Sequence, residues 1–284
     1  MSPWLSLLQK PKNLRDKGVA QNWFTEIGNY LLNGSDLIVG NQVHRIIEIE
    51  FYCFAPEHPD YFAHRDPLQK ECGSWYFHRS GGKYKNGSFK GLDLTFGDGE
   101  MFCGVLFRTI ESSTGKLICG PSLCVDYLLA SSDHDDVKSL DEAIAGKKAW
   151  DPQNPVFLRE KNIQEENQIF RSGRVGLTLR KAKSFPSLTE YILKPYRYFV
   201  EPRKVSKGKP YIVLSMYLQG LSQEDIKQNT GSPNSSIERY INDFEVGKQE
   251  EDFSPYFVKN LNTKALCKLH GTWYQHFLSN VSAQ

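Results

Sequence analysis

Residues 43–52 read VHRIIEIEFY, and this stretch decides the fold of the first part of the chain. Its side chains alternate, with Ile49 and Phe51 on an apolar face and acidic residues on the other, and a period of two predicts a β-strand. Residues two apart on a strand point the same way, so Glu50 and Tyr52 share the polar face. That pair indicates either a general base beside a stacking ring or an edge strand whose outer face meets water.

Similar patterns continue on both sides of this stretch. Further strands are predicted at residues 75–78, 91–96, 101–111, 175–179 and 198–200. Helices are predicted at residues 22–32, 120–129 and 140–145. Residues 1–20 have no steady period and are expected to form a flexible or wrapping arm. Strands grouped in this way with a few helices indicate the α+β class.

The sequence pattern changes from strand-rich to helical after residue 204. Residues 205–210 (VSKGKP) have the composition of a linker, and the sequence beyond them is helical in pattern. Helices at residues 211–220, 222–228 and 235–244, with a turn at Thr230-Gly231, resemble a helix-turn-helix. The predicted domains are an arm over residues 1–20, a first domain over residues 21–204 and a small all-α helix-turn-helix-like domain over residues 205–284.

The third of these helices is a candidate DNA contact. In a helix-turn-helix its start would face the major groove through Asn234, Ser235, Glu238 and Arg239. Charge argues the other way, because the chain from Pro210 onward carries six Lys or Arg and eight Asp or Glu residues. Helix-turn-helix units also serve packing or dimerisation, so DNA contact and protein packing both stay open.

The overall composition excludes several classes of protein. The 284 residues are 39% hydrophobic and 24% charged, with a formal net charge of +2, which rules out collagen-like, coiled-coil and wholly disordered chains. No apolar run approaches the roughly 20 residues that a membrane span needs, and the first residues do not resemble a secretory signal. Six scattered cysteines without a CxxC pair are expected to be reduced, in a cytoplasmic or nuclear protein that is not secreted.

No motif for a cofactor or metal is present in the sequence. No GxxxxGK or GxGxxG follows a predicted strand, and the histidines and cysteines lack zinc spacing. Residues 133–136 (DHDD) are more typical of a solvated acidic turn than of a calcium loop. We therefore expect neither a cofactor nor a metal.

A series of short motifs follows in one order along residues 20–202. They are Arg45-Ile-Ile-Glu-Ile-Glu-Phe-Tyr52, Ala63-His64, Gly73-Ser-Trp-Tyr76, Leu92-Asp-Leu-Thr95, Cys103-Gly-Val-Leu-Phe-Arg-Thr-Ile-Glu111, Leu117-Ile-Cys-Gly-Pro-Ser-Leu-Cys124, Asp141-Glu-Ala, Ser172-Gly-Arg-Val-Gly176 and Lys194-Pro-Tyr-Arg-Tyr-Phe-Val200. This series resembles the alkyladenine DNA glycosylases, also called 3-methyladenine or methylpurine DNA glycosylases. The resemblance implies a mixed, mainly antiparallel curved sheet with flanking helices.

The resemblance also implies roles for individual residues in a base-excision reaction on a flipped base. Glu50 matches the carboxylate that activates water and stabilises positive charge on the sugar. Arg108 matches a pocket arginine that orients the nucleotide. The base- and nucleotide-binding positions are matched by Tyr52 and His78 as the two stacking walls, His64 near the backbone, Asp93 at the position of a pocket asparagine and Leu106 at the pocket floor.

Three positions depart from the pattern of that family. The tip that normally wedges into the duplex is a tyrosine before glycine, whereas this chain has Lys85-Asn86-Gly87, so Lys85 and Asn86 become the candidate DNA contacts. A wall tyrosine is replaced by His78, which can titrate near pH 6.5. The pocket asparagine is replaced by Asp93, which only accepts hydrogen bonds when ionised.

The sequence therefore predicts a metal-free DNA glycosylase that hydrolyses the N-glycosidic bond of a flipped damaged or modified base, as in base excision repair. Its predicted partner is DNA, duplex or single-stranded, and no membrane. The departures leave a non-alkyl modified base or RNA open as the substrate. A non-catalytic DNA-binding or regulatory protein is the alternative from another class, and the helix-turn-helix-like region motivates it.

Overall fold

A computed structural model describes residues 2–16, 18–258 and 260–279 of the chain. The chain forms two compact units, which we call the sheet unit (Met1–Ile169 with Tyr198–Val200) and the helical unit (Phe170–Arg197 with Glu201–Gln284). The predicted boundary after residue 204 thus falls inside the helical unit. Residues before it are held to the last helix by side chains such as Trp273, whose indole Nε1 donates to the Glu190 carbonyl at 2.9 Å.

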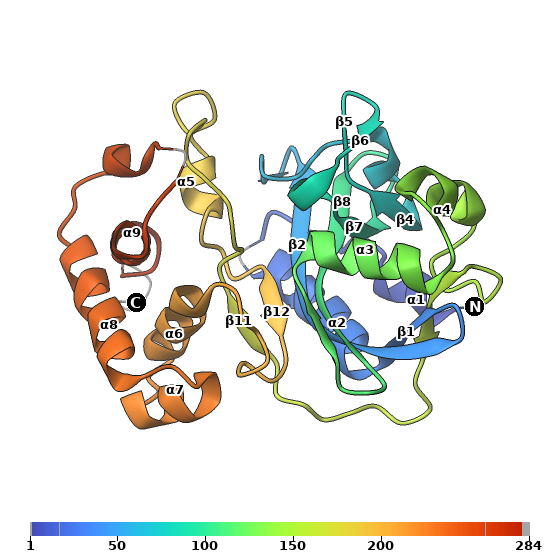
Figure 1. Cartoon of the computed structure of the whole chain (residues 1–284). Coiled ribbons are helices and arrows are strands. Elements are labelled where there is room, and N and C mark those ends of the chain that lie inside the picture. The colour runs from blue at the N-terminus through green and yellow to red at the C-terminus, as the bar shows by residue number, and fades with distance from the viewer. Residues whose placement is uncertain (1, 17, 259, 280–284) are drawn as a thin grey trace. The chain divides into compact units, whose positions relative to one another are not determined.

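The sheet unit is built on an antiparallel sheet (Figure 1). Its strands run in the order β10-β1-β2-β8-β7-β4, and every neighbouring pair along this path is antiparallel. The bounds are β1 Ser35–Val39, β2 Gln42–Ala55, β3 His58–Pro59, β4 Cys72–Phe77, β5 Arg79–Ser80, β6 Lys83–Tyr84, β7 Leu92–Phe96, β8 Phe102–Ser112, β9 Leu117–Cys119, β10 Val156–Glu160 and β12 Arg197–Phe199. The predicted α+β class and mainly antiparallel sheet are confirmed.

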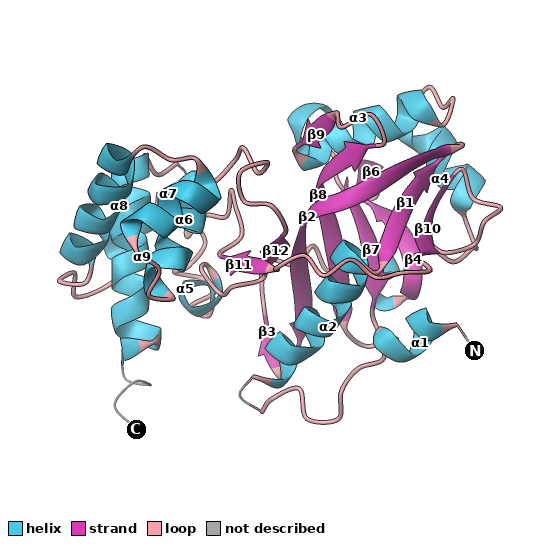
Figure 2. Cartoon of the chain, turned by 90° about the horizontal axis from the view of Figure 1, so that it is seen from below, coloured by secondary structure: helices cyan, strands magenta, loops and turns pink. Residues whose placement is uncertain are grey.

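Helices flank both faces of this sheet, as Figure 2 shows. Their bounds are α1 Pro3–Leu7, α2 Val19–Asn33, α3 Pro121–Ser131 and α4 Val137–Ile144, with 3₁₀ turns at Pro67–Lys70 and Gly87–Phe89. The apolar side of β2 packs on α2, where the rings of Phe24 and Phe51 stack at 4.8 Å between centroids. Because strand side chains alternate, the acidic side of β2 faces away from α2, toward the side covered by α3 and α4.

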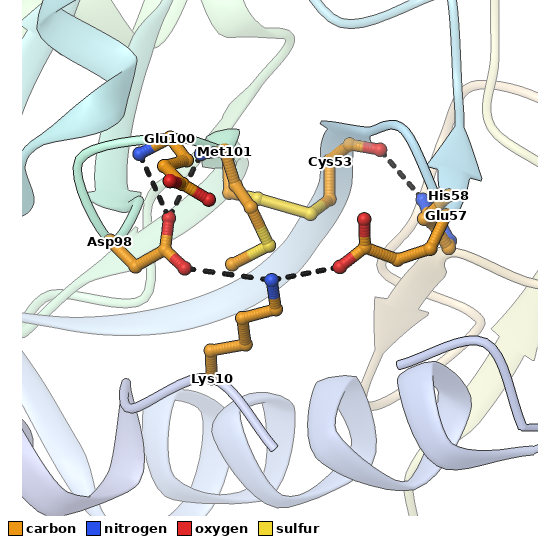
Figure 3. The surroundings of a disulfide bond; sticks show 8 residues. Lys10, Cys53, Glu57, His58, Asp98, Glu100 and Met101 are labelled. Atoms are coloured by element: carbon orange, nitrogen blue, oxygen red, sulfur yellow. Dashed lines mark hydrogen bonds and ion pairs between the residues drawn. A yellow bond between two sulfur atoms is a disulfide. The ribbon is translucent and has the colours of Figure 1, made fainter. Parts of the chain in front are cut away.

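The N-terminal segment packs on the sheet unit. Trp4 is buried and stacks on Trp150 with 5.7 Å between ring centroids. Lys10 pairs with Glu57 at 2.8 Å and with Asp98 at 3.6 Å (Figure 3). Of the two predicted forms of residues 1–20, these contacts correspond to the wrapping one.

A disulfide joins the two central strands and corrects the prediction that all six cysteines are reduced. Cys53 of β2 and Cys103 of β8 are directly opposed in the antiparallel register, with 4.1 Å between their Cα atoms (Figure 3). The sequence hides this pair because 50 residues separate its members, and only strand register brings them together. The cysteine pattern therefore no longer favours a reducing compartment.

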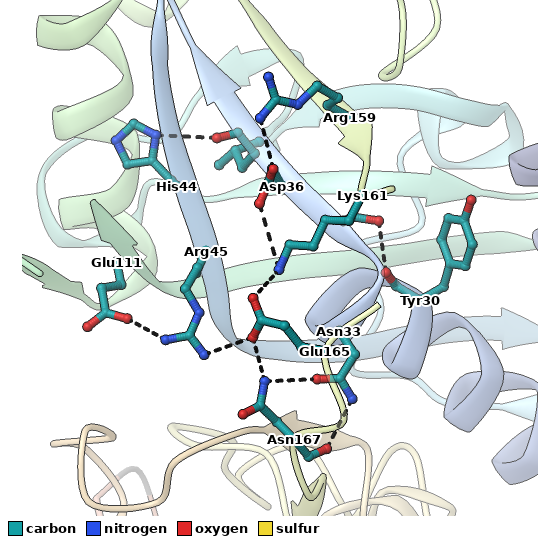
Figure 4. Close-up of polar contacts among 12 residues, drawn as sticks. Tyr30, Asn33, Asp36, His44, Arg45, Glu111, Arg159, Lys161, Glu165 and Asn167 are labelled. Carbon is teal, nitrogen blue, oxygen red and sulfur yellow. Dashed lines mark hydrogen bonds and ion pairs between the residues drawn. The ribbon is translucent and has the colours of Figure 1, made fainter. Parts of the chain in front are cut away.

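A network of charged and amide side chains fixes the chain where it leaves β10 (Figure 4). Glu165 accepts from Arg45 at 3.2 Å, from Lys161 at 2.6 Å and from Asn167 at 2.6 Å. Arg45 also pairs with Glu111 at 2.8 Å, which ties the segment to β2 and β8 together. The contacts lie on a partly exposed surface, so we expect them to position this segment more than to stabilise the unit.

The helical unit contains the short strand β11 and a set of packed helices. Their bounds are β11 Phe170–Ser172, α5 Leu188–Tyr191, α6 Lys209–Leu218, α7 Gln223–Thr230, α8 Asn234–Gly247 and α9 Thr263–Phe277, with a 3₁₀ turn at Ser254–Tyr256. The helices predicted after residue 210 are confirmed, whereas the strand predicted at residues 175–179 is wrong. Helices α8 and α9 approach closely at Gly271, where an added Cβ would lie 1.9 Å from the Phe244 carbonyl oxygen.

Burial of His270 in this unit should make the free energy of unfolding depend on pH. Burial lowers the pKa of the imidazole to about 3, whereas the unfolded chain would take up a proton near pH 6.5. The unfolded state thus binds more protons below about pH 6.5, so the free energy of unfolding should fall as the pH drops, by up to about 1.4 kcal/mol per pH unit. His270→Phe should flatten this slope in urea unfolding followed by circular dichroism between pH 4 and 8. Equal slopes in the two proteins would contradict the expectation.

Two further properties concern the described residues as a whole. None of the helices in this part of the chain has the length and apolar character needed to cross a membrane. The same residues contain no group of three or more His, Cys, Asp or Glu side chains placed to hold a metal ion.

Candidate active site

The predicted catalytic and base-binding residues of the sheet unit come together on one face of the sheet. Glu50 of β2 lies opposite Leu106 of β8, and Leu106 lies opposite Asp93 of β7. Asp93 in turn lies opposite Tyr76 of β4. Directly opposed residues project to the same face, so these four form a row across neighbouring strands. With about 4.8 Å between strands, the backbones of Glu50 and Asp93 are about 10 Å apart.

The other predicted pocket residues lie one step along the same strands. Tyr52 and Arg108 are each two residues beyond a member of the row, so they share its face. His78 follows the end of β4, and its ring lies 5.9 Å from the ring of Tyr76. His64 comes from the loop before β4, and its ring meets that of His78 edge-on at 4.2 Å. Segments between residues 50 and 108 thus converge on one place.

Two buried carboxylates surround the guanidinium of Arg108. Its Nε donates to Glu48 at 2.9 Å and its Nη1 donates to Glu50 at 3.1 Å. Glu48 is 2% exposed, Glu50 is 0% exposed and Arg108 is 6% exposed. Burial lowers the pKa of Arg108, but Glu50 and then Glu48 raise it by more, so the pKa lies above its usual value. The cluster therefore places two carboxyl groups around one guanidinium in a region that excludes water.

Tyr52 links this cluster to the open side of the site. Its hydroxyl donates to Glu50 Oε2 at 2.7 Å, and its ring is only half-buried. The hydrogen bond holds the carboxylate of Glu50 in one orientation and leaves part of the ring facing solvent. A flat ring with one exposed side is suited to stacking on another ring.

The second wall is built from His78 and Asp93. His78 Nε2 lies 2.8 Å from Asp93 Oδ1, and Gln69 Nε2 donates to Asp93 Oδ2 at 3.3 Å. Gly91 covers the His78 ring so closely that an added Cβ would lie 2.5 Å from its Cε1 atom. Gly104 meets Asp93 in the same way, with an added Cβ 2.6 Å from Oδ2. The two glycines thus fix the position of this His–Asp pair.

Lys85 and His64 close one side of the site. The ammonium Nζ of Lys85 lies 2.8 Å from His64 Nε2, so the lysine donates to a neutral imidazole. Desolvation lowers the pKa of Lys85. Desolvation, and after it the His78 ring, also lowers the pKa of His64. Lys85 therefore lies within the cluster of predicted site residues.

Two other candidate contacts, Asn86 and Arg239, are not members of this row. Asn86 is exposed in the loop that precedes the 3₁₀ turn Gly87–Phe89. Arg239 is exposed on α8 of the helical unit, with its guanidinium 5.6 Å from the centre of the Tyr240 ring. The neighbouring Asn234, Ser235 and Glu238 are exposed as well, as expected for a surface at the start of α8.

Sequence reasoning assigned no role to three residues of this region. Glu48 completes the buried cluster, and its position two residues before Glu50 could have indicated it. Gln69 supports Asp93 from a separate loop, for which the sequence has no signal. Phe89 is 74% exposed, in a loop that α3 holds through a 2.6 Å hydrogen bond from the Ser122 hydroxyl to the Gly87 carbonyl.

Comparisons with known proteins add little to this geometry. No protein-family model matches the chain. An uncharacterized protein of Acanthamoeba polyphaga mimivirus is 27% identical over 206 residues, which cover 66% of this chain and 91% of that protein. The similarity thus extends over most of a shorter viral protein.

The site has two chemical properties that matter for function. It offers a buried carboxylate held by Tyr52 and Arg108, and it has aromatic rings on β2 and β4. An oriented carboxylate in a dry environment can accept a proton from water and can stabilise a nearby positive charge. An aromatic ring beside such a group, as Tyr52 provides, suits contact with a flat heterocycle.

Proposed function

We propose that the protein hydrolyses the bond between a flipped base and deoxyribose in DNA. The observation that carries the proposal is the row of Glu50, Leu106 and Asp93 across β2, β8 and β7, with the buried Glu48–Arg108–Glu50 cluster at one end. This arrangement agrees with the roles implied by resemblance to the alkyladenine DNA glycosylases.

The proposed reaction needs one water and no electron transfer. The bond from the base nitrogen to the sugar carbon breaks, and its electron pair leaves with the base. The sugar becomes oxocarbenium-like, and the carboxylate of Glu50 stabilises it. Water adds to the sugar carbon and gives its proton to the carboxylate of Glu50. A base that leaves as an anion takes up a proton from solvent and Glu50 returns its own, so the products are the free base and the abasic sugar. Arg108 is buried against both carboxylates, so we assign it to positioning them.

The His–Asp pair bears on which base is preferred. Tyr52 and His78 would stack on the base, a contact worth about 1–3 kcal/mol per base. A carboxylate at position 93 accepts hydrogen bonds, so a base edge that presents N–H groups would be favoured over one that presents a carbonyl. This preference supports a non-alkyl modified base as a substrate, alongside the alkylated purines. RNA stays an alternative substrate.

The helical unit supports the alternative function, that of a non-catalytic DNA-binding or regulatory protein. Helices α7 and α8 are joined by a short turn at Gly231, and the start of α8 is exposed. A protein that only binds DNA through this surface would bind duplex and release no base. DNA is the partner in both readings, and action on DNA would place the protein in the cytoplasm of a prokaryote or the nucleus of a eukaryote.

Phe89 is proposed to replace the missing wedge tyrosine. Its ring is exposed in the same loop as Lys85, and α3 anchors that loop at Gly87. Phe89→Ala should therefore slow base release from duplex DNA by about tenfold, since lost stacking is worth about 1–3 kcal/mol, and should change release from single strands little. Phe89→Trp should keep the duplex rate. Equal losses on both substrates would show that Phe89 does not act on the duplex.

A binding experiment tests the proposal without knowledge of the base. Duplexes carrying either a cationic pyrrolidine or a neutral tetrahydrofuran in place of one deoxyribose are titrated with the protein at fixed salt. A site that stabilises an oxocarbenium ion should bind the cationic duplex at least ten times more tightly than the neutral one. Equal affinities would reject Glu50 as a group that stabilises charge on the sugar.

A further inference from the structure

Lys85 supplies a half-buried amine to which the proposed hydrolysis assigns no chemical step. Its Nζ lies 2.8 Å from His64 Nε2, and the His64 ring meets the His78 ring with 4.2 Å between centroids. His78 in turn contacts Asp93 at 2.8 Å. The amine therefore belongs to the same group of side chains as His78, the ring proposed to stack on the flipped base.

The hairpin of β5 and β6 holds this amine in place. The backbone N–H of Lys85 donates to the His78 carbonyl at 2.9 Å, which closes the hairpin directly at the lysine. The Tyr84 hydroxyl donates to Asp141 Oδ2 at 2.8 Å, and Arg79 pairs with the same carboxylate. These contacts tie the hairpin to α4, so the position of Lys85 is set by the fold and not by a free loop.

The surroundings of Lys85 favour the uncharged form of its amine. Desolvation lowers the pKa of Lys85 by more than the charge of Asp93 raises it. Its partner His64 has a lowered pKa as well and is a neutral imidazole. The contact is accessible to a reactant, because His64 is exposed and Lys85 is only half-buried. An uncharged, positioned lysine amine is the form that adds to a carbonyl carbon.

We propose that Lys85 attacks the abasic deoxyribose left by base removal, so that the protein also cuts the strand on the 3′ side of the abasic site. This inference rests on the proposed function, because base release creates the abasic sugar. It adds an activity, since hydrolysis by Glu50 leaves the strand intact. The C1′ carbon of the sugar is the atom that carried the base, so an amine at the edge of the base-binding site is suited to reach it.

The reaction begins when the abasic sugar opens to an aldehyde at C1′. The lone pair of the Lys85 amine adds to that carbon, and the carbonyl oxygen leaves as water with the two amine protons, so a C=N bond forms. The C2′ proton then passes to solvent, and its bonding pair forms a double bond between C2′ and C3′. The C3′–O bond breaks, and its electron pair leaves with the phosphate. Water finally hydrolyses the C=N bond and restores the amine, so no oxidant or reductant is consumed.

The test uses the full chain and a duplex that already carries one abasic deoxyribose, so the result does not depend on base release. Sodium borohydride reduces the C=N bond and joins the protein to the DNA through a stable amine. Wild type should give this trapped complex and, without borohydride, strand cleavage at the abasic site. A duplex with tetrahydrofuran at the same position has no aldehyde and should give neither product.

Lys85→Arg should reduce both products at least about tenfold, since a guanidinium stays protonated and does not form the C=N bond. Lys83→Arg is the matched control, because Lys83 is exposed on β6 of the same hairpin and the substitution is the same. It should give both products at the level of wild type. Peptide mapping of the trapped wild-type complex should locate the DNA adduct on Lys85, and this measurement does not depend on the folding of a variant.

Three results would overturn the proposal. One is the absence of a trapped complex with wild type. Another is an adduct on the N-terminal amine or on a different lysine, and the third is equal trapping by wild type and Lys85→Arg. None of these results bears on the proposed hydrolysis, which is measured by release of free bases from DNA that still carries them.

Discussion

Glu50→Gln is expected to slow base release by about a thousandfold or more and to leave the affinity for DNA within a few-fold of wild type. The amide keeps the size of the side chain and an acceptor for Tyr52, but it can neither take a proton from water nor stabilise a cationic sugar. General-base and electrostatic contributions of this kind are worth about 10²–10⁴ in rate. Single-turnover release of the base from a substrate duplex measures the rate. Titration of the protein with the same duplex measures the affinity.

Glu48→Gln is the matched control for this experiment. It removes the same charge from the same guanidinium, because Arg108 donates to both carboxylates. Glu48 also accepts a hydrogen bond from the Thr109 hydroxyl at 2.6 Å. This contact fits a residue that positions Arg108 and does not itself react. We expect Glu48→Gln to retain at least about a tenth of the rate. Equal losses in the two variants would assign the effect to the charge of the cluster and not to Glu50 as a base.

Arg108→Met should produce the largest loss of stability in the sheet unit. The substitution leaves two buried carboxylates without their guanidinium, and breaking a buried pair in this way costs about 3–5 kcal/mol. Urea unfolding followed by tryptophan fluorescence is suitable, because Trp4, Trp23, Trp75 and Trp150 lie in the sheet unit and only Trp273 lies in the helical unit.

Arg45→Met, on the neighbouring strand β2, is the control. Arg45 also pairs with two glutamates, Glu111 and Glu165, but its side chain is 31% exposed, so its removal should cost about 1 kcal/mol or less. Similar losses in the two variants would contradict the account of the buried cluster.

Strands β2, β4, β7 and β8 could be predicted because the evidence for them is local, whereas β1 and β10 were not predicted. The period of two along residues 43–52 became part of β2, and the helices after residue 210 follow from their caps and apolar spacing. Ser222 caps α7 by accepting from the Asp225 amide, and Gly231 ends that helix with a positive φ. These signals lie within a few residues of the element they determine.

Features that depend on strand register could not be predicted in the same way. The Cys53–Cys103 disulfide and the Glu48–Arg108 pair both need β2 and β8 to align with particular residues opposed. A bulge near Glu48 shifts that register, and alternation alone does not reveal a bulge. The grouping of residues 170–197 with the C-terminal helices rests on tertiary contacts such as that of Trp273 with the Glu190 carbonyl.

The candidate site was predictable as a set of residues but not as a geometry. Resemblance to a family indicated Glu50, Tyr52, His64, His78, Asp93, Leu106 and Arg108. It did not indicate that Arg108 would be buried between two carboxylates or that Lys85 would donate to His64. Both contacts depend on which side chains lie on the same face of the sheet. They change the roles expected of Arg108 and Lys85.

The most direct test of the central claim is identification of the bases that the protein releases. Wild type and Glu50→Gln are incubated with randomly methylated duplex DNA, with deaminated duplex DNA and with untreated DNA, and free bases are identified by mass spectrometry. The account predicts at least one modified base that wild type releases and Glu50→Gln does not. Release of the same base by both proteins, or no release from any of the substrates by wild type, would contradict it.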